Sequence, residues 1–421
     1  MLKSAKPALV LLLLTYTVQV GAQDTFRMPA EWEPQEAVWV GIFHRPGRER
    51  VSAAIIKSIY KQVQVRLNFQ ADSTKYSFNR LLNSFQIDTT KLQWILDSVS
   101  FNWPRDPGPQ FLVNEKGEQK VIDFGWNDYG SRFITGKKPG RIDNIIGRTD
   151  IRMAGFLKLP VLSTPVVAEG GGLETNGRGV LMSIEETALQ RNPDMTLPEI
   201  EKEYLRVTGC SKMIWLKRMT LHDKSVPGLL VGNWTSEGAN GHIDEVARFV
   251  SPNTILLAKI DASERKKNPI SQADDEILKE DYEILRKATD INGKPFTIIR
   301  IPYPDLNAHA ISYLLDDDMR KNFPSPIPHL KNGDTLKFVP AVSYMNFMIT
   351  NGIVLVPAYW KEGMPLREKE KDEEVKKIFE KLFPNRKIIQ INPYSINGGG
   401  GGIHCATLQQ PKKLSKVPSP N

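Results

Sequence analysis

GGGGGIHCATLQQP, residues 398–411, contains five consecutive glycines followed closely by a histidine and a cysteine. Ordering a glycine run costs conformational entropy, so the packing of a core alone does not explain it. A backbone without side chains can approach a ligand or a reactive group closely. The stretch therefore indicates either a plain flexible loop or a functional loop that brings Cys405 to a ligand.

Strand-like and helix-like segments alternate along the chain that precedes this loop. Four apolar runs rich in β-branched residues predict strands: 254–260, 296–304, 352–360 and 387–394. Apolar residues at helical spacing predict helices within 196–207, 277–285 and 375–382, and Thr196 and Glu199 have the spacing of a capping box. No Pro- or Ser-rich linker divides the chain, so we expect one α/β domain over residues 23–410 and a loose basic tail over 411–421.

The composition is that of an ordinary globular protein. With 40% hydrophobic and 25% charged residues the chain is neither disordered nor fibrous, and two cysteines cannot staple a scaffold of 421 residues. The 56 Lys and Arg residues exceed the 48 Asp and Glu residues, which gives a net charge of +8. The two ends of the chain carry most of this excess, so the charge does not predict nucleic-acid binding.

The first 22 residues predict a cleaved secretory signal. Lys3 and Lys6 precede the short apolar run ALVLLLL (8–14), and the small residues VGA (20–22) allow cleavage before Gln23. The apolar run is shorter than the roughly 20 residues that span a bilayer. No cysteine follows the cleavage site, so a lipid anchor is not predicted either. We therefore expect a secreted or periplasmic protein without a stable membrane anchor.

Two cysteines in a secreted chain raise the possibility of a disulfide. Oxidising compartments favour pairing, so a Cys210–Cys405 bond is one expectation. The two neighbourhoods differ, because Cys210 lies between a helical pattern and an apolar run, where small buried thiols are common. The other expectation, which we favour, is a structural Cys210 and a free, reactive Cys405.

Three further Gly- or Pro-rich turns carry residues that rarely cluster for packing reasons. They are WPRDPGP (103–109), EGGG (169–172) and NGHID (240–244). Taken singly, Asp106 fits a turn acid and Glu169 a surface ion pair. His242 and Asp244, which share a face if the segment is extended, fit an exposed hydrogen-bonded pair. Their co-occurrence with Cys405 in turns at strand ends favours a catalytic site, because such loops usually carry catalytic groups.

The glycines do not form a nucleotide-binding motif. Ile403 and Thr175 stand where the last glycine of G-x-G-x-x-G would be, and no GxxxxGK[ST] is present. A metal site on His242, Asp244 and His404 is conceivable but lacks the HExxH or paired CxxC spacing. We therefore predict neither a cofactor nor a metal.

Taken together, the motifs resemble the agmatine deiminase and bacterial peptidyl-arginine deiminase family. The resemblance covers about residues 27–411 and is carried by RMPAEWEP (27–34), WPRDPGP, EGGG, NGHID, SYMNF (343–347) and GGGGGIHCATLQQP. It is closer to the agmatine deiminase branch, from which the chain departs in its longer glycine run and at Leu408, where that branch usually has Gln. The resemblance implies a five-bladed, pseudo-symmetric α/β propeller of ββαβ-type repeats.

The resemblance implies cysteine-dependent hydrolysis of a guanidinium group, and the residue types fit that chemistry. A guanidinium stays protonated in water and presents five N–H donors, which suits the carboxylates of Asp106 and Asp244. Cys405 as a thiolate would attack the guanidinium carbon and expel ammonia. His242 would serve as general acid and then as base for water, and Glu169 would orient His242.

Three other residues near these motifs have supporting or undecided roles. Trp103 fits a wall against which the flat cation stacks, or simply a core Trp. Asn346 matches the SYxNF segment of the family and would support the site. His404 would face away from Cys405 in a strand, so no catalytic role is expected for it.

Two substrates fit this reaction, and the sequence leaves the choice open. Agmatine would give N-carbamoylputrescine, a step of polyamine metabolism, and peptidyl-arginine would give peptidyl-citrulline; both release ammonia. The closer branch favours agmatine, whereas secretion favours exposed arginine residues or scavenged amines. Arg132 or Arg141 would suit recognition of a substrate carboxylate. A non-catalytic binding protein with the same fold is the alternative of another class, and the oligomeric state stays open.

Overall fold

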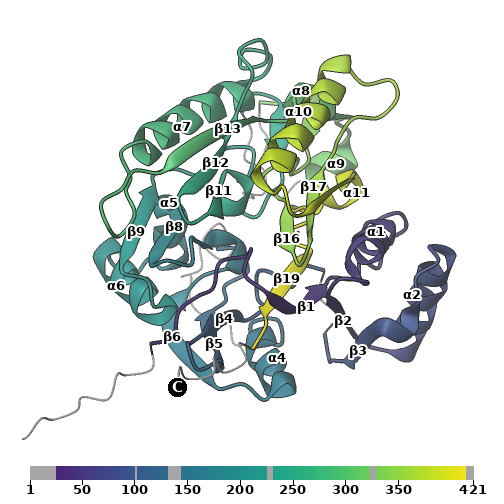
Figure 1. Cartoon of the computed structure of the whole chain (residues 1–421). Coiled ribbons are helices and arrows are strands. Elements are labelled where there is room, and N and C mark those ends of the chain that lie inside the picture. Colours follow the sequence, from purple (N-terminus) through teal and green to yellow (C-terminus); the bar gives the residue numbers. More distant parts are fainter. Residues whose placement is uncertain (1–24, 100–101, 131–143, 225–230, 323–328, 414–421) are drawn as a thin grey trace, which may run out of the picture.

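The computed structural model describes residues 25–99, 102–130, 144–224, 231–322 and 329–413 (Figure 1). The predicted signal peptide over 1–22 and residues 414–421 of the predicted tail lie outside the described residues. Within these ranges none of the helices is long and apolar enough to cross a membrane. Strands and helices alternate along the chain, so the predicted mixed α/β class is confirmed.

The strands of the described residues form six small sheets, and five of these share one arrangement. In each of the five, an antiparallel pair is followed by a parallel pair. The five sheets are β19-β1-β2-β3, with β19 (Thr407–Pro411), β1 (Gln35–Val40), β2 (Gln64–Phe69) and β3 (Leu92–Leu96); β4-β5-β6, with β4 (Gln110–Val113), β5 (Gln119–Gly125) and β6 (Val161–Val167); β7-β8-β9, with β7 (Glu174–Thr175), β8 (Val180–Ile184) and β9 (Lys212–Leu216); β11-β12-β13, with β11 (Ala247–Ser251), β12 (Thr254–Lys259) and β13 (Thr297–Pro302); and β16-β17-β18, with β16 (Met348–Thr350), β17 (Ile353–Pro357) and β18 (Lys387–Ile391).

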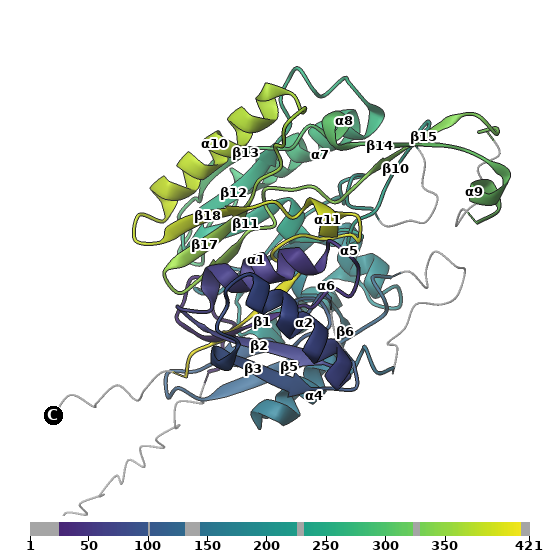
Figure 2. The same cartoon turned by 90° about the vertical axis from the view of Figure 1, so that its right-hand side faces the viewer.

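The sixth sheet differs from the other five. It contains β10 (Trp234–Ser236), β15 (Thr335–Val339) and β14 (Ile311–Leu314), with the parallel pair at β10 and the antiparallel pair at β14. Figure 2 shows that this sheet and helix α9 (Asp317–Asn322) extend away from the remaining sheets.

Helices connect the parallel strands, because a parallel pair needs a longer crossover than a hairpin. The crossovers contain α1 (Glu49–Ile59), α2 (Asp72–Ser84), α4 (Thr149–Leu157), α6 (Leu197–Thr208), α7 (Pro269–Leu285) and α10 (Leu366–Leu382). The remaining helices and 3-10 turns are short: α5 (Glu185–Arg191), α8 (Leu306–His309), α11 (Tyr394–Asn397), η1 (Thr89–Lys91), η2 (Gly170–Gly172) and η3 (Ile243–Glu245). Figure 1 shows α4, α6 and α7 at the outer edge of the molecule, with the sheets inside them.

The structure confirms the long elements predicted from the sequence. Strands β12, β13, β17 and β18 fall within the four predicted runs, and α6, α7 and α10 contain the three predicted helical patterns. The predicted capping box is also present, because the Thr196 and Glu199 side chains each bind the backbone of the other residue at the start of α6.

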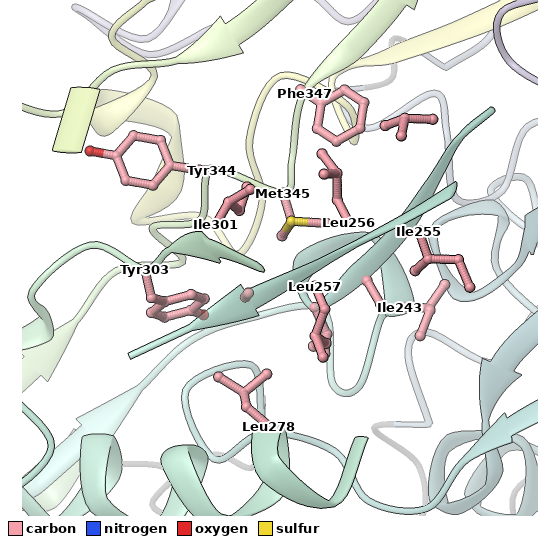
Figure 3. Close-up of a cluster of buried hydrophobic side chains, with 14 of the residues drawn as sticks. Ile243, Ile255, Leu256, Leu257, Leu278, Ile301, Tyr303, Tyr344, Met345 and Phe347 are labelled. Atoms are coloured by element: carbon pink, nitrogen blue, oxygen red, sulfur yellow. The ribbon is translucent and has the colours of Figure 1, made fainter. Parts of the chain in front are cut away.

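A buried apolar cluster fixes two segments that carry candidate site residues. Figure 3 shows Ile243, Met345 and Phe347 in this cluster, close to β12. His242 and Asp244 flank Ile243 in the sequence, and Asn346 stands between Met345 and Phe347. Burial of the apolar members therefore holds the backbone that carries their polar neighbours.

The first and last described strands pair with each other. β1 runs antiparallel to β19, from the pair Gln35–Pro411 to the pair Val40–Thr407. Pro411 was expected to begin the loose tail, and that boundary is wrong. Pro411 ends β19, and its carbonyl accepts a hydrogen bond of 2.7 Å from Gln119 Nε2.

Candidate active site

Cys405 lies in a turn over 403–406 that leads into β19, and its side chain is only 1% exposed. Its Sγ lies 3.1 Å from Asn346 Nδ2 and 3.6 Å from Asp244 Oδ2. Both cysteines are free, and Cys210 is buried next to Thr175. The disulfide alternative is therefore wrong, and the prediction of a free Cys405 thiol is confirmed.

The glycines before Cys405 let the loop lie directly against its neighbours. A Cβ on Gly401 would lie 3.0 Å from both Cys405 Cβ and Trp103 Cζ3, and a Cβ on Gly402 would lie 2.7 Å from Asn346 Oδ1. The distance at Gly402 is shorter than real Cβ contacts, and those at Gly401 are tighter than most of them, so a side chain at either position would require its neighbours to move. Trp103 is partly buried and also packs edge-to-face on Phe43 at 4.9 Å. Its side chain therefore contacts both the apolar core and the glycine loop.

His242 is fully buried between three carboxylates. Its Nδ1 lies 3.6 Å from Asp106 Oδ1 and 3.9 Å from Asp244 Oδ1, and its Nε2 lies 3.7 Å from Glu169 Oε2. Within the described residues neither ring nitrogen has a hydrogen-bond partner. The segment is not an extended strand, since His242 is the N-cap of η3, and this turn brings His242 and Asp244 together.

Burial and neighbouring charges shift the pKa values of His242 and Asp106 in opposite directions. Burial disfavours an imidazolium, but Asp106, Glu169 and Asp244 outweigh it and raise the pKa of His242 to about 9. Burial raises the pKa of Asp106 to about 6, although His242 acts in the opposite direction. At neutral pH the site therefore holds a protonated His242 beside an ionised Asp106.

Glu169 stays ionised because it binds Arg191. Arg191 Nε donates to both carboxylate oxygens, at 2.9 and 3.1 Å, and both side chains are 1% exposed. Burial disfavours the carboxylate, but Arg191 and His242 hold the pKa of Glu169 at about 2. The sequence did not reveal Arg191, because a basic residue in the last turn of a helix such as α5 is ordinary.

Asp106 is held by two donors. Its Oδ2 accepts a hydrogen bond of 2.9 Å from the Tyr129 hydroxyl, and its Oδ1 accepts one of 3.3 Å from the Gly171 backbone N–H. The Tyr129 ring also lies 5.7 Å from the His242 ring. A Cβ on Gly171 would lie 2.4 Å from His242 Nδ1, so this glycine makes room for the histidine. Tyr129 was not predicted, and its aromatic turn GWNDYG (125–130) was the only local signal.

Asn346 connects the thiol to two backbone groups and to a second acid. Its Nδ2 donates to Glu245 Oε1 at 2.7 Å besides contacting Cys405 Sγ. Its Oδ1 accepts hydrogen bonds from the backbone N–H groups of His404 and Cys405, at 2.8 and 3.3 Å. Asn346 therefore fixes the turn that carries the Cys405 thiol. A supporting position of this kind was expected for Asn346 from the sequence.

The Cys405 thiol lies in an environment that disfavours its ionisation. Burial, followed by the charges of Asp244, Asp106 and Glu245, raises the pKa of Cys405 well above its usual value. A nucleophilic thiolate therefore needs a cation close to it. Protonated His242 and a cationic ligand are the two candidates for that charge.

The sequence predicted that His404 faces away from Cys405, as neighbouring residues of a strand do. In the structure, His404 faces the site instead. Its Nδ1 lies 2.6 Å from Asp244 Oδ2 and its Nε2 lies 2.7 Å from Glu31 Oε2. The expectation is wrong because β19 begins only at Thr407, so the alternation of a strand does not apply to residues 404 and 405.

Asp223 holds the loop that precedes η3. Its carboxylate accepts hydrogen bonds from the backbone N–H groups of Ala239, Gly241 and His242, at 2.7, 2.8 and 2.7 Å. These three bonds set the position of the His242 backbone. Asp223 was not predicted, because it lies outside the four motifs.

Some of these side chains could in principle share a metal ion. The ligand atoms of Asp106, His242 and Cys405 lie within 4.8 Å of one another, and so do those of Asp244, Glu245 and Cys405. A metal requires a neutral imidazole and a thiolate. Because His242 is protonated and Cys405 is a thiol at neutral pH, a metal bound to these residues would have to displace both protons.

The predicted residues Cys405, His242, Glu169, Asp106, Asp244 and Asn346 thus meet in one buried site, with Trp103 at the glycine loop beside it. Arg132 and Arg141 lie outside the described residues. The resulting arrangement places a thiol beside a protonated histidine and two carboxylates, which can attract a cation.

Known proteins resemble this chain over almost its whole length. The family described as Porphyromonas-type peptidyl-arginine deiminase matches residues 27–411. A protein of Listeria monocytogenes with the provisional name agmatine deiminase 2 is 30% identical over 395 residues, which cover 93% of this chain and 96% of that protein. The agmatine deiminase structure of Enterococcus faecalis matches with a TM-score of 0.71 at 24% identity, over 93% of this chain and 97% of the other. A structure from Porphyromonas gingivalis, provisionally described as an arginine deiminase, matches with a TM-score of 0.66 at 20% identity, over 92% and 98%. The two structures share the fold of this chain.

Proposed function

The chain belongs to the Porphyromonas-type peptidyl-arginine deiminase family, whose enzymes hydrolyse a guanidino C–N bond, and we propose that it is a cysteine-dependent agmatine deiminase. One observation carries the mechanism: Asp244 Oδ1, which lies close to His242, is buried without a hydrogen-bond partner among the described residues. An unpaired buried acceptor costs about 1–3 kcal/mol. A guanidinium, with five N–H donors, supplies the missing partner.

The first half of the reaction forms a covalent intermediate. The guanidinium binds between Asp106 and Asp244, and the Cys405 thiol gives its proton to solvent as this cation binds. Cys405 Sγ then attacks the guanidinium carbon, so that a C–S bond forms. His242 gives its proton to the departing nitrogen, and ammonia leaves as the C–N bond breaks.

The second half consumes water and restores the thiol group. His242, now neutral, takes a proton from water, and the oxygen attacks the thiouronium carbon. The C–S bond breaks as the C=O bond forms, and the proton of the hydroxyl passes to the sulfur, so that Cys405 is a thiol again. The net reaction adds one water and releases ammonia, and with agmatine it leaves N-carbamoylputrescine.

The charges described above support this order of events. Glu169, kept ionised by Arg191, stabilises the imidazolium that acts as the acid. Burial and then the neighbouring carboxylates raise the pKa of Cys405, and a bound cation offsets the charge of the carboxylates. The substrate itself therefore promotes formation of the thiolate, and the empty site keeps its thiol protonated.

The identity of the substrate rests on the relatives. The names of the Listeria monocytogenes and Enterococcus faecalis proteins support agmatine. Peptidyl-arginine is the second candidate, because the matching family is described by that substrate. A non-catalytic binding protein with the same fold is disfavoured, since every proposed catalytic position holds a competent side chain.

Ammonia release from agmatine and from an arginine peptide, measured side by side, tests the proposal. We expect turnover of agmatine and a loss of roughly a thousandfold or more for Cys405→Ser, because the covalent step is removed. Cys210→Ser is the matched control and should retain activity, since Cys210 lies away from the site residues. Absence of ammonia from both substrates would refute the deiminase proposal.

We further propose that residues 1–22 are removed on secretion, that residues 23–411 form one catalytic domain, and that the five similar sheets are the blades of an α/β propeller. The shared strand order supports the last point. A mature N-terminus at a position other than Gln23 would contradict the first, and a crystal structure without fivefold pseudo-symmetry would contradict the last.

A further inference from the structure

A chain of buried polar side chains leads from the site to the N-terminal segment. His404 is 1% exposed, and its two ring nitrogens face two carboxylates, Asp244 Oδ2 at 2.6 Å and Glu31 Oε2 at 2.7 Å. The side chain of Glu31 is 13% exposed and also accepts hydrogen bonds from Ile349 N and Gln409 Nε2, each at 2.7 Å. His404 is thus fixed at both ends of its ring.

Arg248 completes this chain. It is fully buried, donates from Nε to Glu174 Oε1 at 2.6 Å, and contacts both Glu31 and His404 through Nη2. Its guanidinium also lies 4.1 Å from the centroid of the Phe347 ring and binds the Phe347 carbonyl. A planar group held on all sides in this way has little freedom to move.

A second metal site is not a better explanation for this cluster. The ligand atoms of Glu31, Glu174 and His404 do lie within 4.8 Å of one another. Arg248, however, binds all three residues and supplies the positive charge that a metal would bring. The cluster is therefore an ionic network with its own positive charge, and His404 links it by a hydrogen bond to Asp244 of the candidate active site.

Given the proposed deiminase function, on which this step rests, we infer that His404, held by Glu31 and Arg248, is a positioning residue that orients the Asp244 carboxylate for the guanidinium. The bond to His404 occupies Asp244 Oδ2 and fixes the plane of the carboxylate. Oδ1 is then left unpaired within the described part of the chain and lies 3.9 Å from His242 Nδ1. One oxygen is thus anchored to the protein and the other is presented to the substrate.

Two substitutions separate the two ends of the His404 ring. His404→Asn places an amide N–H near the position of Nδ1, where it can still donate to Asp244. His404→Gln places it near the position of Nε2, where it reaches Glu31 and leaves Asp244 without its donor. We expect His404→Asn to keep a KM close to wild type, and His404→Gln to raise KM about tenfold to a hundredfold, with a smaller change in kcat.

The pH profile gives a readout that simple loss of structure does not produce. Burial disfavours ionisation of Asp244, but His404, His242 and Arg248 hold the pKa of Asp244 below its usual value. The other titratable groups that interact with it are Asp106, Glu245, Cys405 and Arg105. Removing the His404 donor raises the pKa of Asp244. In His404→Gln a second carboxylate besides Asp106 then gains a proton on the acidic limb of kcat/KM, so that limb should become steeper or move to higher pH. The limb should change less in His404→Asn, which keeps the hydrogen bond to Asp244.

His309→Gln is the matched control, because His309 is equally buried and binds the carboxylate of Glu368 at 2.8 Å, within another buried ionic cluster. It should shift neither KM nor the acidic limb. Calorimetry of agmatine with Cys405→Ser, alone and combined with each His404 variant, measures guanidinium binding without turnover. Equal effects of His404→Asn and His404→Gln would overturn the positioning role. An inactive wild type would refute the deiminase function instead, while the calorimetric comparison would still show whether His404 positions Asp244.

Discussion

His242 and Asp106 show how single residues in this site are tuned against their burial. A fully buried imidazole is normally neutral, yet three carboxylates within 3.9 Å raise the pKa of His242 to about 9. Asp106 is buried as deeply, and its pKa is raised to about 6. Between about pH 6 and about pH 9, the Asp106 carboxylate, which we propose binds the guanidinium, is ionised. His242, which we propose protonates the departing nitrogen, still carries its proton in this range.

This pH range predicts a bell-shaped pH dependence of kcat/KM, which reports the free enzyme. As the pH falls through about 6, Asp106 gains a proton and no longer attracts the guanidinium, so the rate falls. As the pH rises through about 9, His242 loses the proton that ammonia needs, so the rate falls again. Initial rates of ammonia release at low substrate concentration, from pH 4.5 to 10.5, would measure both limbs; a profile flat over that range contradicts the assignment.

Tyr129→Phe is the sharper form of this experiment. The Tyr129 hydroxyl bond favours the ionised form of Asp106, so its removal should move the acidic limb to higher pH and leave the basic limb in place. An unchanged acidic limb would mean that another group controls it.

Most of the polar residues that meet in the candidate site could be predicted from the sequence, and several residues that hold them in place could not. Cys405, His242 and Asp106 each stand in a Gly- or Pro-rich turn, where reactive or titratable side chains are easily recognised in the sequence. Arg191 and Tyr129, in contrast, stand 22 and 23 residues from their carboxylate partners. Only folding brings such partners together, and nothing in the local sequence distinguishes these residues from ordinary helix and turn positions.

Among the elements, the glycine loop shows most directly how backbone shape serves the site. Gly401 and Gly398 stand in the same loop, and neither has a left-handed φ. A Cβ on Gly401 would meet Cys405 and Trp103 at 3.0 Å, whereas a Cβ on Gly398 would meet only Arg48 Nη2, at an ordinary 3.7 Å. The two positions therefore differ in their contacts and not in their backbone class.

Gly401→Ala should displace the thiol by a few tenths of an ångström or more and lower kcat/KM by about a hundredfold. Gly398→Ala should leave it within about twofold, because its new methyl group makes an ordinary contact. Ammonia release, with urea unfolding of both variants to compare stability, checks this pair. Similar losses in the two variants would contradict close packing as the reason for the glycines.

Regular elements followed from the sequence, and the short turns of the site did not. Helix α6 begins at its capping box, and β12 and β17 coincide with apolar runs. The 3-10 turns η2 and η3 are three residues each and have no periodicity to detect. Their shape depends on tertiary contacts instead, such as the bonds from Asp223 to the N–H groups before η3.

At the scale of the whole molecule, the C-terminal strand joins the two ends of the chain. Trp39 of β1 pairs with Leu408 of β19, and both pack with Phe111 and Val121 in a buried cluster between the first two sheets. Cys405 stands just before β19, so the pairing of the first and last described strands also places the thiol. Contacts between residues so far apart in sequence form only when most of the chain is folded.

Leu408→Ala should therefore destabilise the whole protein and not only its C-terminus. Leu408 is 2% exposed, and its loss leaves a cavity beside Trp39 and Phe111, which costs about 2–5 kcal/mol in the free energy of unfolding. Leu314→Ala removes the same atoms from a side chain that is 70% exposed and should change it by less than about 0.5 kcal/mol. Urea unfolding followed by both tryptophan fluorescence and ammonia release should give one coincident transition at lower urea for Leu408→Ala, because the strand belongs to the single proposed domain. Two separate transitions, or equal stabilities of the two variants, would show that β19 is a local addition to a fold that closes without it.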